Sequence, residues 1–370
     1  MRAFYFFADT PRRRAALQAE PGAAERYVLY GLDQEVARGV SAAHNLERSV
    51  PLPGWTRAAD RAVAWSLRRV HGTGGDLASP LANLGSANRS DVVVATIDRL
   101  GIPLTLLARA RLLRTALVYV SVGLPERLAR LSGRVRHFHL SALRHADAFV
   151  AYSEHEAEEI RAALGPGAAP VVFVPFGVDT ERFRPRADAV HDLDVVSIGA
   201  DPHRDLALLV RIAGRRPEWQ FHLVVAFEGK RALGSLPENV QVETDIPFGE
   251  MRDRLARARV VALPVRDNSY SGGTTVLLQA MAAARPVVVS RTAAIESGYG
   301  LADGRNCTLV APGDEAAFER ALATLLDDAD AAAALGLRAR AHVELELSWE
   351  RYAGAMHDVL VDAVARHSTR

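Results

Sequence analysis

Short runs of apolar residues alternate with longer mixed segments along the first half of the chain. The apolar runs are AFYFFA (3–8), DVVVAT (91–96), ALVYVSV (116–122), AFVAYS (148–153) and VVFVPF (171–176). Continuous runs of this length are typical of parallel strands that are buried on both faces of a sheet. Helical patterns lie at 24–39, ending at a cap glycine, at 103–113, at 126–146 with a break near Gly133, and at 154–164. The alternation predicts a doubly wound parallel sheet.

The pattern starts again after 176–191, a stretch rich in charged residues, proline and turn formers. Strands are expected at 193–200, 219–226, 240–245, 260–265 and 307–311, and helices at 250–258 and 314–328. The predicted fold class is therefore α/β, with two Rossmann-like domains whose ligands bind at the carboxyl ends of the strands. We place an N-terminal domain at 1–183, a C-terminal domain at 184–350, and at 351–370 a helix that packs back on the N-terminal domain.

Two strand–glycine–helix elements in the second domain have the features of a phosphate site. In SYSGGTTVLLQAMAAARPVVVS, Gly272 and Gly273 precede a helix. Glycine lets a phosphate approach the free amides of a helix N-terminus, where the helix dipole favours an anion. In SIGADPHRDLALL, the turn contains Gly199 and Arg204, and an arginine fork suits a diphosphate. The structural alternatives are an ordinary helix cap and a surface ion pair of Arg204 with a neighbouring aspartate.

Composition narrows the functional classes. The formal net charge is +1, so no overall field attracts nucleic acid, and the hydrophobic fraction of 49% is ordinary for a globular protein. Cys307 is the only cysteine, which excludes an internal disulfide and a cysteine-based zinc cluster. The first residues lack the pattern of a signal peptide, and no stretch is apolar enough to span a membrane. We therefore expect a cytoplasmic protein without a metal site, and we interpret His137, His139 and His145 as solvated or capping residues.

The junction and the C-terminal domain resemble a known enzyme family. FVPFGVDTERFRP (173–185) is similar to the junction of retaining glycosyltransferases with the GT-B fold, of the large family-4 type. GGTTVLLQAMAAARPVVVSRT resembles their donor-binding segment, although both acids of the usual Glu-x7-Glu motif are replaced. ADGRNCTLVAPGDEAAFERALATLLDD and ARAHVELELSWERYAGAM resemble the segments that follow. The resemblance covers residues 91–360 with the order and spacing intact.

The resemblance implies a nucleotide-sugar donor held by the C-terminal domain and an acceptor held by the N-terminal domain. Arg204 corresponds to the basic residue on the donor diphosphate, and the base is expected near Phe248. Gln279 corresponds to the acid that holds the ribose, and Ser271 to the acid near the donor sugar. The other donor contacts expected are Gly199, Gly272, Gly273 and Thr274 beside the phosphates, and Asp267, Asn268 or Tyr270 in place of the missing acid.

The family mechanism implies retention by front-face displacement, in which the leaving diphosphate takes the acceptor proton without an enzymatic nucleophile, a cofactor or a metal. Catalysis then consists of positioning and of stabilising the departing phosphate, a task for Arg204 and the helix N-terminus. Gln279 can still hydrogen-bond a ribose diol, but without a charge. Many relatives carry a histidine near the donor sugar where this chain has Ser121 and Gly123. The donor sugar and base are left open.

Fewer features mark the acceptor side. Asp9 begins DTPRRR, where the family's acceptor loop lies, and Ser121, Gly123 and Glu126 follow a mid-sheet strand. The acceptor can be a carbohydrate, a lipid-linked sugar or a small molecule. The segment 55–72 has a basic amphipathic pattern that suits peripheral contact with the inner face of a membrane, although a helix packed on the core is the simpler interpretation.

Three other functions match parts of the pattern. A catalytically silent GT-B relative, which binds a nucleotide sugar or activates a second transferase, would explain the missing acids. A GT-B epimerase would need acid/base carboxylates and a histidine in places where the chain does not offer them. A dehydrogenase would carry a GxGxxG motif after the first strand, and this sequence does not.

Overall fold

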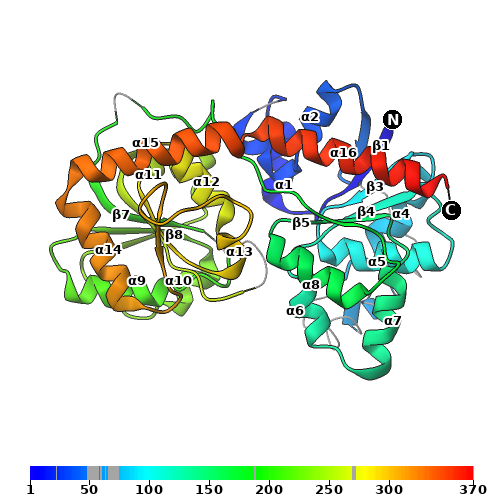
Figure 1. The fold of residues 1–370 in the computed structure, drawn as a ribbon, viewed down its shortest axis with the longest axis horizontal. Helices are drawn as coiled ribbons and strands as arrows, with labels where there is room; N and C mark the ends of the chain where they lie inside the picture. The colour runs from blue at the N-terminus through cyan, green and yellow to red at the C-terminus, as the bar shows by residue number, and fades with distance from the viewer. Residues whose placement is uncertain are drawn as a thin grey trace. The chain divides into compact units, whose positions relative to one another are not determined.

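The chain forms two compact units (Figure 1). The computed structural model describes residues 1–21, 23–47, 58, 61–62, 64–65, 75–186, 189–199, 201–268 and 272–369. Unit 1 contains Met1–Val174 and Ala353–Arg370, and unit 2 contains Pro175–Tyr352. The first boundary therefore comes earlier than the end of the domain that we placed at 1–183 from the sequence.

Unit 1 is built around a six-stranded parallel sheet in the order β2-β1-β3-β4-β5-β6. Its strands are β1 (Arg2–Phe6), β2 (Ser41–His44), β3 (Val92–Ala95), β4 (Ala116–Val120), β5 (Ala148–Ala151) and β6 (Val171–Phe173). Its helices are α1 (Pro11–Gln18), the 3₁₀ helix η1 (Ala24–Leu29), α2 (Leu32–Ala37), α4 (Ala78–Ala87), α5 (Asp98–Arg109), α6 (Leu124–Ala129), α7 (Gly133–Leu143) and α8 (Glu154–Leu164). The direction of winding reverses between β1 and β3, which is the topological switch point of this sheet.

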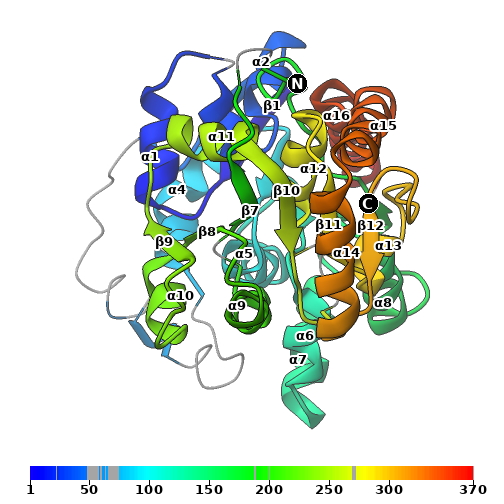
Figure 2. The ribbon, with the colours of Figure 1, turned by 90° about the vertical axis from the view of Figure 1, so that its left-hand side faces the viewer.

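Unit 2 contains a second six-stranded parallel sheet, in the order β12-β11-β10-β7-β8-β9 (Figure 2). Its strands are β7 (Leu193–Ile198), β8 (Phe221–Val225), β9 (Val240–Thr244), β10 (Ala258–Leu263), β11 (Val287–Ser290) and β12 (Thr308–Val310). Its helices are α9 (Leu206–Arg215), α10 (Phe227–Ala232), α11 (Phe248–Arg257), α12 (Thr274–Ala282), α13 (Ala293–Glu296), α14 (Glu315–Asp327) and α15 (Ala329–Glu346). The switch point lies between β7 and β10, as in Rossmann sheets.

The helix α16 (Trp349–His367) begins in unit 2, and its residues from Ala353 onward belong to unit 1. Within unit 1, His357 Nδ1 lies 2.8 Å from the Oε2 atom of buried Glu35, and His367 Nδ1 lies 3.1 Å from Asp147 Oδ2. These polar contacts attach the end of the chain to unit 1.

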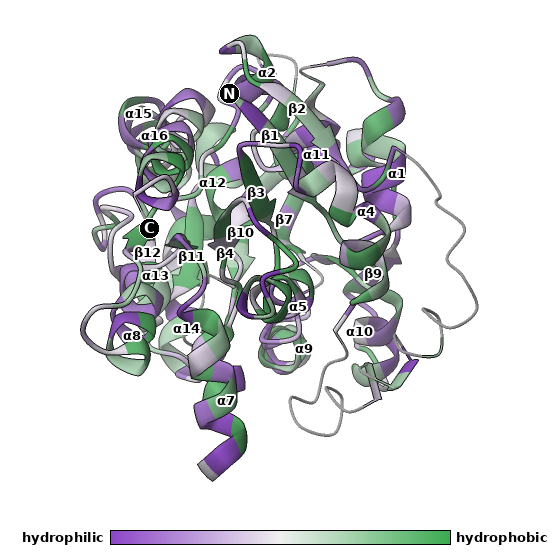
Figure 3. Ribbon diagram, turned by 90° about the vertical axis from the view of Figure 1, so that its right-hand side faces the viewer, coloured by the Kyte–Doolittle hydropathy of each residue, from purple (hydrophilic) through white to green (hydrophobic). Residues whose placement is uncertain are grey.

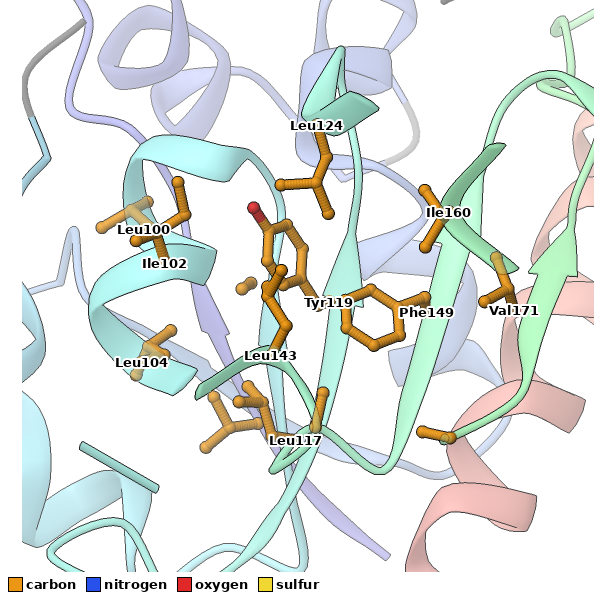
Figure 4. Close-up of a cluster of buried hydrophobic side chains, with 14 of the residues drawn as sticks. Leu100, Ile102, Leu104, Leu117, Tyr119, Leu124, Leu143, Phe149, Ile160 and Val171 are labelled. Carbon is orange, nitrogen blue, oxygen red and sulfur yellow. The ribbon is translucent and has the colours of Figure 1, made fainter. Parts of the chain in front are cut away.

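Each sheet has an apolar core, as strands buried on both faces require. In unit 1, the Tyr119 and Phe149 rings lie 5.3 Å apart and are surrounded by leucines and isoleucines from the covering helices (Figure 4). Every residue of β3, β4 and β5 is buried. In unit 2, Phe221, Phe318 and leucines of α9 and α14 form the corresponding cluster. The predicted α/β class with two doubly wound parallel sheets is confirmed.

The prediction of one helix at 24–39 is wrong. The 3₁₀ helix η1 ends at Tyr30, whose φ is +51°, and α2 follows after Gly31, whose φ is +82°. Two successive left-handed residues interrupt helical hydrogen bonding, so the apolar spacing belongs to two short helices rather than one. The structure also adds β2 and α10, which the apolar pattern did not predict.

Cys307 is buried in unit 2 next to β12. Burial, reinforced by the nearby Asp303 carboxylate, raises the pKa of its thiol to about 12. The thiol is therefore protonated at neutral pH and acts as a small core residue.

Candidate functional site

Two loops meet at the switch point of unit 2, and hydrogen bonds between them fix the backbone of Arg204. The Asp205 N–H donates to the Pro264 carbonyl at 3.0 Å, and the Arg266 N–H donates to the His203 carbonyl at 2.8 Å. One loop follows β7 and the other follows β10, so both start at the carboxyl end of the sheet. Ligands of open parallel sheets bind at this position.

The guanidinium of Arg204 is buried and only partly hydrogen-bonded. The residue is 5% exposed, and its Nη2 donates to the Ile198 carbonyl at 2.8 Å. Its Nε and Nη1 atoms have no acceptor among the residues that the structure describes. Burial lowers its pKa to about 10, against the opposing effect of the Asp201 carboxylate, so the group stays charged at neutral pH. A buried cation with unused N–H groups is unfavourable unless an anion binds to it.

Two glycines make room for this guanidinium. A Cβ atom on Gly199 would lie 2.9 Å from Arg204 Nη2 and 3.0 Å from its Nε, and the φ of Gly199 is +153°. A Cβ on Gly273 would lie 3.4 Å from Arg204 Cζ, and the φ of Gly273 is +84°. Gly199 therefore requires glycine for space and for backbone conformation, and Gly273 requires it for backbone conformation.

The N-terminus of α12 lies beside the guanidinium. Gly273 is its N-cap and provides no side-chain acceptor for the free amides of the first turn. Thr274, the first helical residue, has a buried hydroxyl without a partner among the described residues. The first turn of α12 and the Arg204 guanidinium thus lie side by side, where the helix dipole adds further positive potential. This donor set is suited to the oxygens of a phosphate or a diphosphate.

The second turn of α12 contains Gln279, which is 2% exposed. Its side-chain amide forms no hydrogen bond with any residue that the structure describes. Gly272, which precedes the N-cap of α12, lies close to Asp201, since a Cβ on Gly272 would be 2.8 Å from Asp201 Oδ2. Asp201 was not among our predicted residues, although it is the charged group that most directly balances Arg204.

The other predicted donor residues have different environments. Asp267 is exposed, whereas Asn268 is 9% exposed, with Nδ2 bonded to the Arg266 carbonyl and a buried Oδ1 that lacks a described partner. Phe248 packs edge-on against Phe183, with ring centres 5.8 Å apart. Phe183 lines a cleft of about 510 Å³ whose lining includes none of the donor residues predicted above. Tyr270 and Ser271 lie outside the described residues.

In unit 1, the loop after β4 is held by a buried glutamate that the sequence analysis did not identify. The Ser121 hydroxyl donates to Glu156 Oε1 at 2.6 Å, and the Gly123 N–H donates to the same atom at 2.8 Å. Glu156 has no exposed surface, and its Oε2 has no partner among the described residues. Burial raises its pKa to about 7, against the opposing hydrogen bond from Ser121. The two predicted acceptor-side residues are therefore bonded to a carboxyl group that titrates near neutral pH.

A second buried carboxylate holds the same loop from the other side. Asp98 Oδ1 accepts hydrogen bonds from the Tyr119 hydroxyl at 2.9 Å and from the Val122 N–H at 3.3 Å. Its Oδ2 lies 3.0 Å from Arg127 Nε. Complete burial raises the pKa of Asp98, and the Arg127 charge opposes this shift.

Asp9 and Glu126 are the remaining predicted acceptor-side residues. Asp9 accepts two hydrogen bonds of 2.8 Å from Arg14, which lower its pKa. Arg13 donates to the Ala8 carbonyl at 3.0 Å. Arg13 and Arg14 also donate to the Val28 and Leu46 carbonyls, at 3.2 and 3.1 Å, so both arginines bind groups of unit 1. Glu126 is half-buried in α6.

Most of 55–72 lies outside the described residues, so its membrane role stays a prediction. No described helix combines the length and the hydropathy that a membrane span requires. Among the described residues, no group of three His, Cys, Asp or Glu side chains could hold a metal ion.

Comparison with known families assigns both halves of the chain. Residues 36–182 match the family described as Glycosyltransferase Family 4, and residues 195–328 match Glycosyl transferases group 1. The chain belongs to these glycosyltransferases. The predicted family is thereby confirmed, and each family match covers most of the sheet of one unit.

Related glycosyltransferases act on several acceptors. The chain is 28% identical over 276 residues to D-inositol 3-phosphate glycosyltransferase from Streptomyces avermitilis, covering 66% of this chain and 57% of that protein. It is 28% identical over 203 residues to MMP alpha-(1->4)-mannosyltransferase from Mycolicibacterium hassiacum, covering 52% of this chain and 48% of that protein. The chain thus spans about half the length of the curated relatives that it matches.

Solved structures show the same fold along nearly the whole chain. Sucrose-phosphate synthase from Thermosynechococcus elongatus has a TM-score of 0.72 at 16% identity, covering 98% of this chain and 99% of that one. Anabaena HepE in complex with UDP-glucose has a TM-score of 0.68 at 16% identity, with the same coverage. At such low identity these structures establish the GT-B fold alone.

Proposed function

We propose that this glycosyltransferase moves a sugar from a nucleoside-diphosphate sugar to an acceptor hydroxyl with retention of configuration. The buried Arg204 guanidinium is the observation that carries the proposal, because two of its nitrogens lack a described acceptor beside the N-terminus of α12. Such a pair of positive groups binds a diphosphate better than a monoanion, since each phosphate can occupy one of them.

In this proposal the donor diphosphate lies between Arg204 and Gly273. The guanidinium donates through Nε and Nη1, and the first-turn amides of α12 and the Thr274 hydroxyl bond the other phosphate oxygens. The relative HepE supports this choice of ligand, since its structures are described as complexes with UDP and UDP-glucose. Gln279 binds the ribose hydroxyls through its neutral amide.

The reaction proceeds on one face of the donor sugar. The bond between the anomeric carbon and the diphosphate oxygen breaks, and the acceptor oxygen forms the new bond on the same side. The acceptor proton passes to the departing diphosphate oxygen, so the step needs no enzymatic nucleophile, cofactor or metal ion. Arg204 and the helix N-terminus stabilise the charge that develops on the leaving group.

Unit 1 supplies the acceptor side, with the Ser121–Gly123 loop at the carboxyl end of its sheet. The relatives' names include an inositol phosphate and a phosphatidylinositol mannoside, which share several hydroxyl groups. We propose a polyhydroxylated acceptor of this general class. Its bonding partners would be polar groups at the ends of β1, β3 and β4.

The test is nucleotide binding by Arg204→Ala, measured by calorimetry with UDP, GDP and ADP. We expect one nucleotide to bind the native protein and the variant to lose about 30-fold or more in affinity, because charge-assisted hydrogen bonds to phosphate are lost. Arg211→Ala is the matched control, since this exposed arginine of α9 pairs with Glu315 on the surface. Unchanged affinity of Arg204→Ala, with a native thermal transition, would disprove the assignment.

A second candidate function is a silent nucleotide-sugar-binding partner of another transferase. The observation that favours it is the neutral Gln279 at a position where the family carries an acid. Purified protein that binds a nucleotide sugar but forms neither a glycoside nor free sugar would support this alternative. Hydrolysis or transfer by the purified chain would exclude it.

A further inference from the structure

Residues 99–144 of unit 1 have a strong excess of positive charge. This segment contains nine arginines and one acidic residue, Glu126, whereas the whole chain has a formal net charge of +1. It runs from α5 to the end of α7 and lies entirely within the described residues. Such an imbalance in an otherwise neutral chain gives this part of the surface a positive potential that favours anionic partners.

Part of this charge is combined with exposed apolar side chains. We define the α7 surface as Arg109, Arg111, Leu112, Arg134, Val135 and Phe138. The Arg109 guanidinium carbon lies 4.6 Å from the centre of the Phe138 ring, which brings the end of α5 against α7. Val135 is one helical turn before Phe138 and shares its side of the helix. Leu112, Val135 and Phe138 are 47%, 42% and 46% exposed.

The N-terminal half of α7 projects from unit 1 (Figure 3). Every residue from Ser132 to Phe138 is exposed, whereas His139 and Leu143 are buried further along the helix. Hydrophilic and hydrophobic positions alternate on this projecting part (Figure 3). A convex tip of this kind is suited to contact a flat surface.

The arginines of the α7 surface are not neutralised by neighbouring acids. Arg109, Arg111 and Arg134 form no ion pair with any carboxylate that the structure describes. By contrast, the surface arginines of α9 pair with acids of α14, with Arg215 Nη2 lying 2.8 Å from Glu319 Oε2. The charge of the α7 surface is therefore available to an external anion.

We propose that the α7 surface docks the protein on a membrane that contains anionic lipids. The arginines bind lipid phosphates, while Leu112, Val135 and Phe138 enter the region between headgroups and acyl chains. Arginine side chains can extend their charged ends to the headgroups while their stems remain among apolar groups. The inference does not depend on the donor site, because all of these residues belong to unit 1.

A membrane explains the surface better than an acidic protein or a nucleic acid. The apolar side chains stand on a projecting helix, so a protein partner would need a complementary groove to bury them. A nucleic acid would use the arginines but leave Leu112 and Val135 without a role, since base stacking requires aromatic rings. A lipid surface uses both groups at once.

The test is co-sedimentation of the full chain with vesicles of phosphatidylcholine alone or of phosphatidylcholine mixed with phosphatidylglycerol. We expect binding to the mixed vesicles only, weakening as salt is raised. The double variant Arg111→Glu, Arg134→Glu should bind at least about tenfold less, and Phe138→Ser about threefold less, because each removes one of the two contributions.

Phe227→Ser is the matched control, since Phe227 is a 56% exposed phenylalanine next to Lys230 and Arg231 in unit 2. It should bind vesicles like the native protein, and all variants should keep native circular dichroism. The proposal fails if the native chain does not bind anionic vesicles, or if the α7 variants bind them normally. It also fails if binding is lost instead on changing Arg68 and Arg69 of 55–72, or if the chain prefers polyglutamate or DNA to vesicles.

Discussion

The two sheets are wound alike, yet opposite charges are buried at their carboxyl ends. Unit 2 holds a cation there, Arg204, with two nitrogens unpaired among the described residues. Unit 1 holds an acid, Glu156, with one oxygen unpaired among the described residues. Burial disfavours the charged form of both groups, so it lowers the pKa of Arg204 and raises the pKa of Glu156. The outcomes differ because the two groups start from very different pKa values.

Burial leaves Arg204 charged but brings Glu156 close to its titration point. A guanidinium with a pKa of about 10 remains a cation at neutral pH, so it needs an anion to complete its bonding. A carboxyl group with a pKa of about 7 is partly neutral there and can remain buried without a counter-ion. The site in unit 2 thus favours an anion, whereas the carboxyl group of unit 1 is partly neutral, which would suit the neutral hydroxyl acceptor that we propose.

The largest effect is expected for Glu156→Gln, on the free energy of unfolding as a function of pH. The ordinary pKa of 4.5 rises to about 7 in the folded protein, so the folded state holds this proton more tightly than the unfolded chain. The resulting stabilisation is complete below pH 4.5 and is lost as pH rises through 7. Glutamine cannot ionise and keeps an acceptor for Ser121. We expect the variant to gain up to about 3 kcal/mol over the native protein between pH 5 and pH 8.

Urea unfolding of both proteins at several pH values measures this difference. Glu154→Gln is the control, because Glu154 starts the same helix with a partly exposed side chain paired with Arg161. Its curve should run parallel to that of the native protein. If Glu156→Gln also runs parallel, the acid of unit 1 is ionised throughout and the contrast with unit 2 disappears.

An intermediate effect is expected for Gly199→Ala, which tests whether the Arg204 position is needed. The added methyl would lie 2.9 Å from Nη2, so the guanidinium must move. We expect about tenfold weaker nucleotide binding, since hydrogen bonds to a displaced group lose their geometry. Titration calorimetry measures the affinity.

Gly214→Ala on α9 is the matched glycine control, because a Cβ there meets nothing within 4 Å. Alanine in a helix should leave binding unchanged and stabilise the fold by about 0.5–1 kcal/mol. Equal effects of the two substitutions on binding would mean that the cation of unit 2 tolerates displacement.

The smallest effect is expected for Gln279→Glu, which introduces the acid that the family carries at this position of α12. A carboxylate forms stronger hydrogen bonds to ribose hydroxyls than an amide, so nucleoside diphosphate should bind about threefold more tightly. Gln241→Glu, an exposed position of β9, should change nothing. Weaker binding by Gln279→Glu would show that this site needs to stay free of negative charge, which sharpens the contrast with unit 1.

Most strands could be predicted because the sheets are parallel and buried on both faces. Runs such as VVVA of β3 have no polar position, and only a covered parallel strand produces them repeatedly. β2 was not predicted because its sequence, SAAH, at the edge of the sheet, has no β-branched residue. α10 was not predicted because its six residues are too few to show a helical period.

The candidate donor site was predictable in part because its residues are close in sequence to glycine turns. Gly199, Arg204 and Gly273 could be placed from such turns, and the structure brings them together. Glu156 could not be recognised in this way. With Ser153 it forms an ordinary capping pattern, and the Ser153 hydroxyl indeed accepts from the Glu156 N–H at 3.0 Å. Its carboxylate instead reaches Ser121, a contact between distant segments that only the fold creates.

The reactivity of the single cysteine, Cys307, can be used to measure local unfolding of unit 2. With a thiol pKa of about 12, only about one Cys307 in 10⁵ is ionised at pH 7, and the side chain is fully buried. Alkylating reagents can therefore react only in molecules whose unit 2 has opened. The rate of labelling at Cys307 thus reports how often this unit unfolds locally, and its decrease with added nucleotide would give the free energy by which a ligand keeps the unit closed.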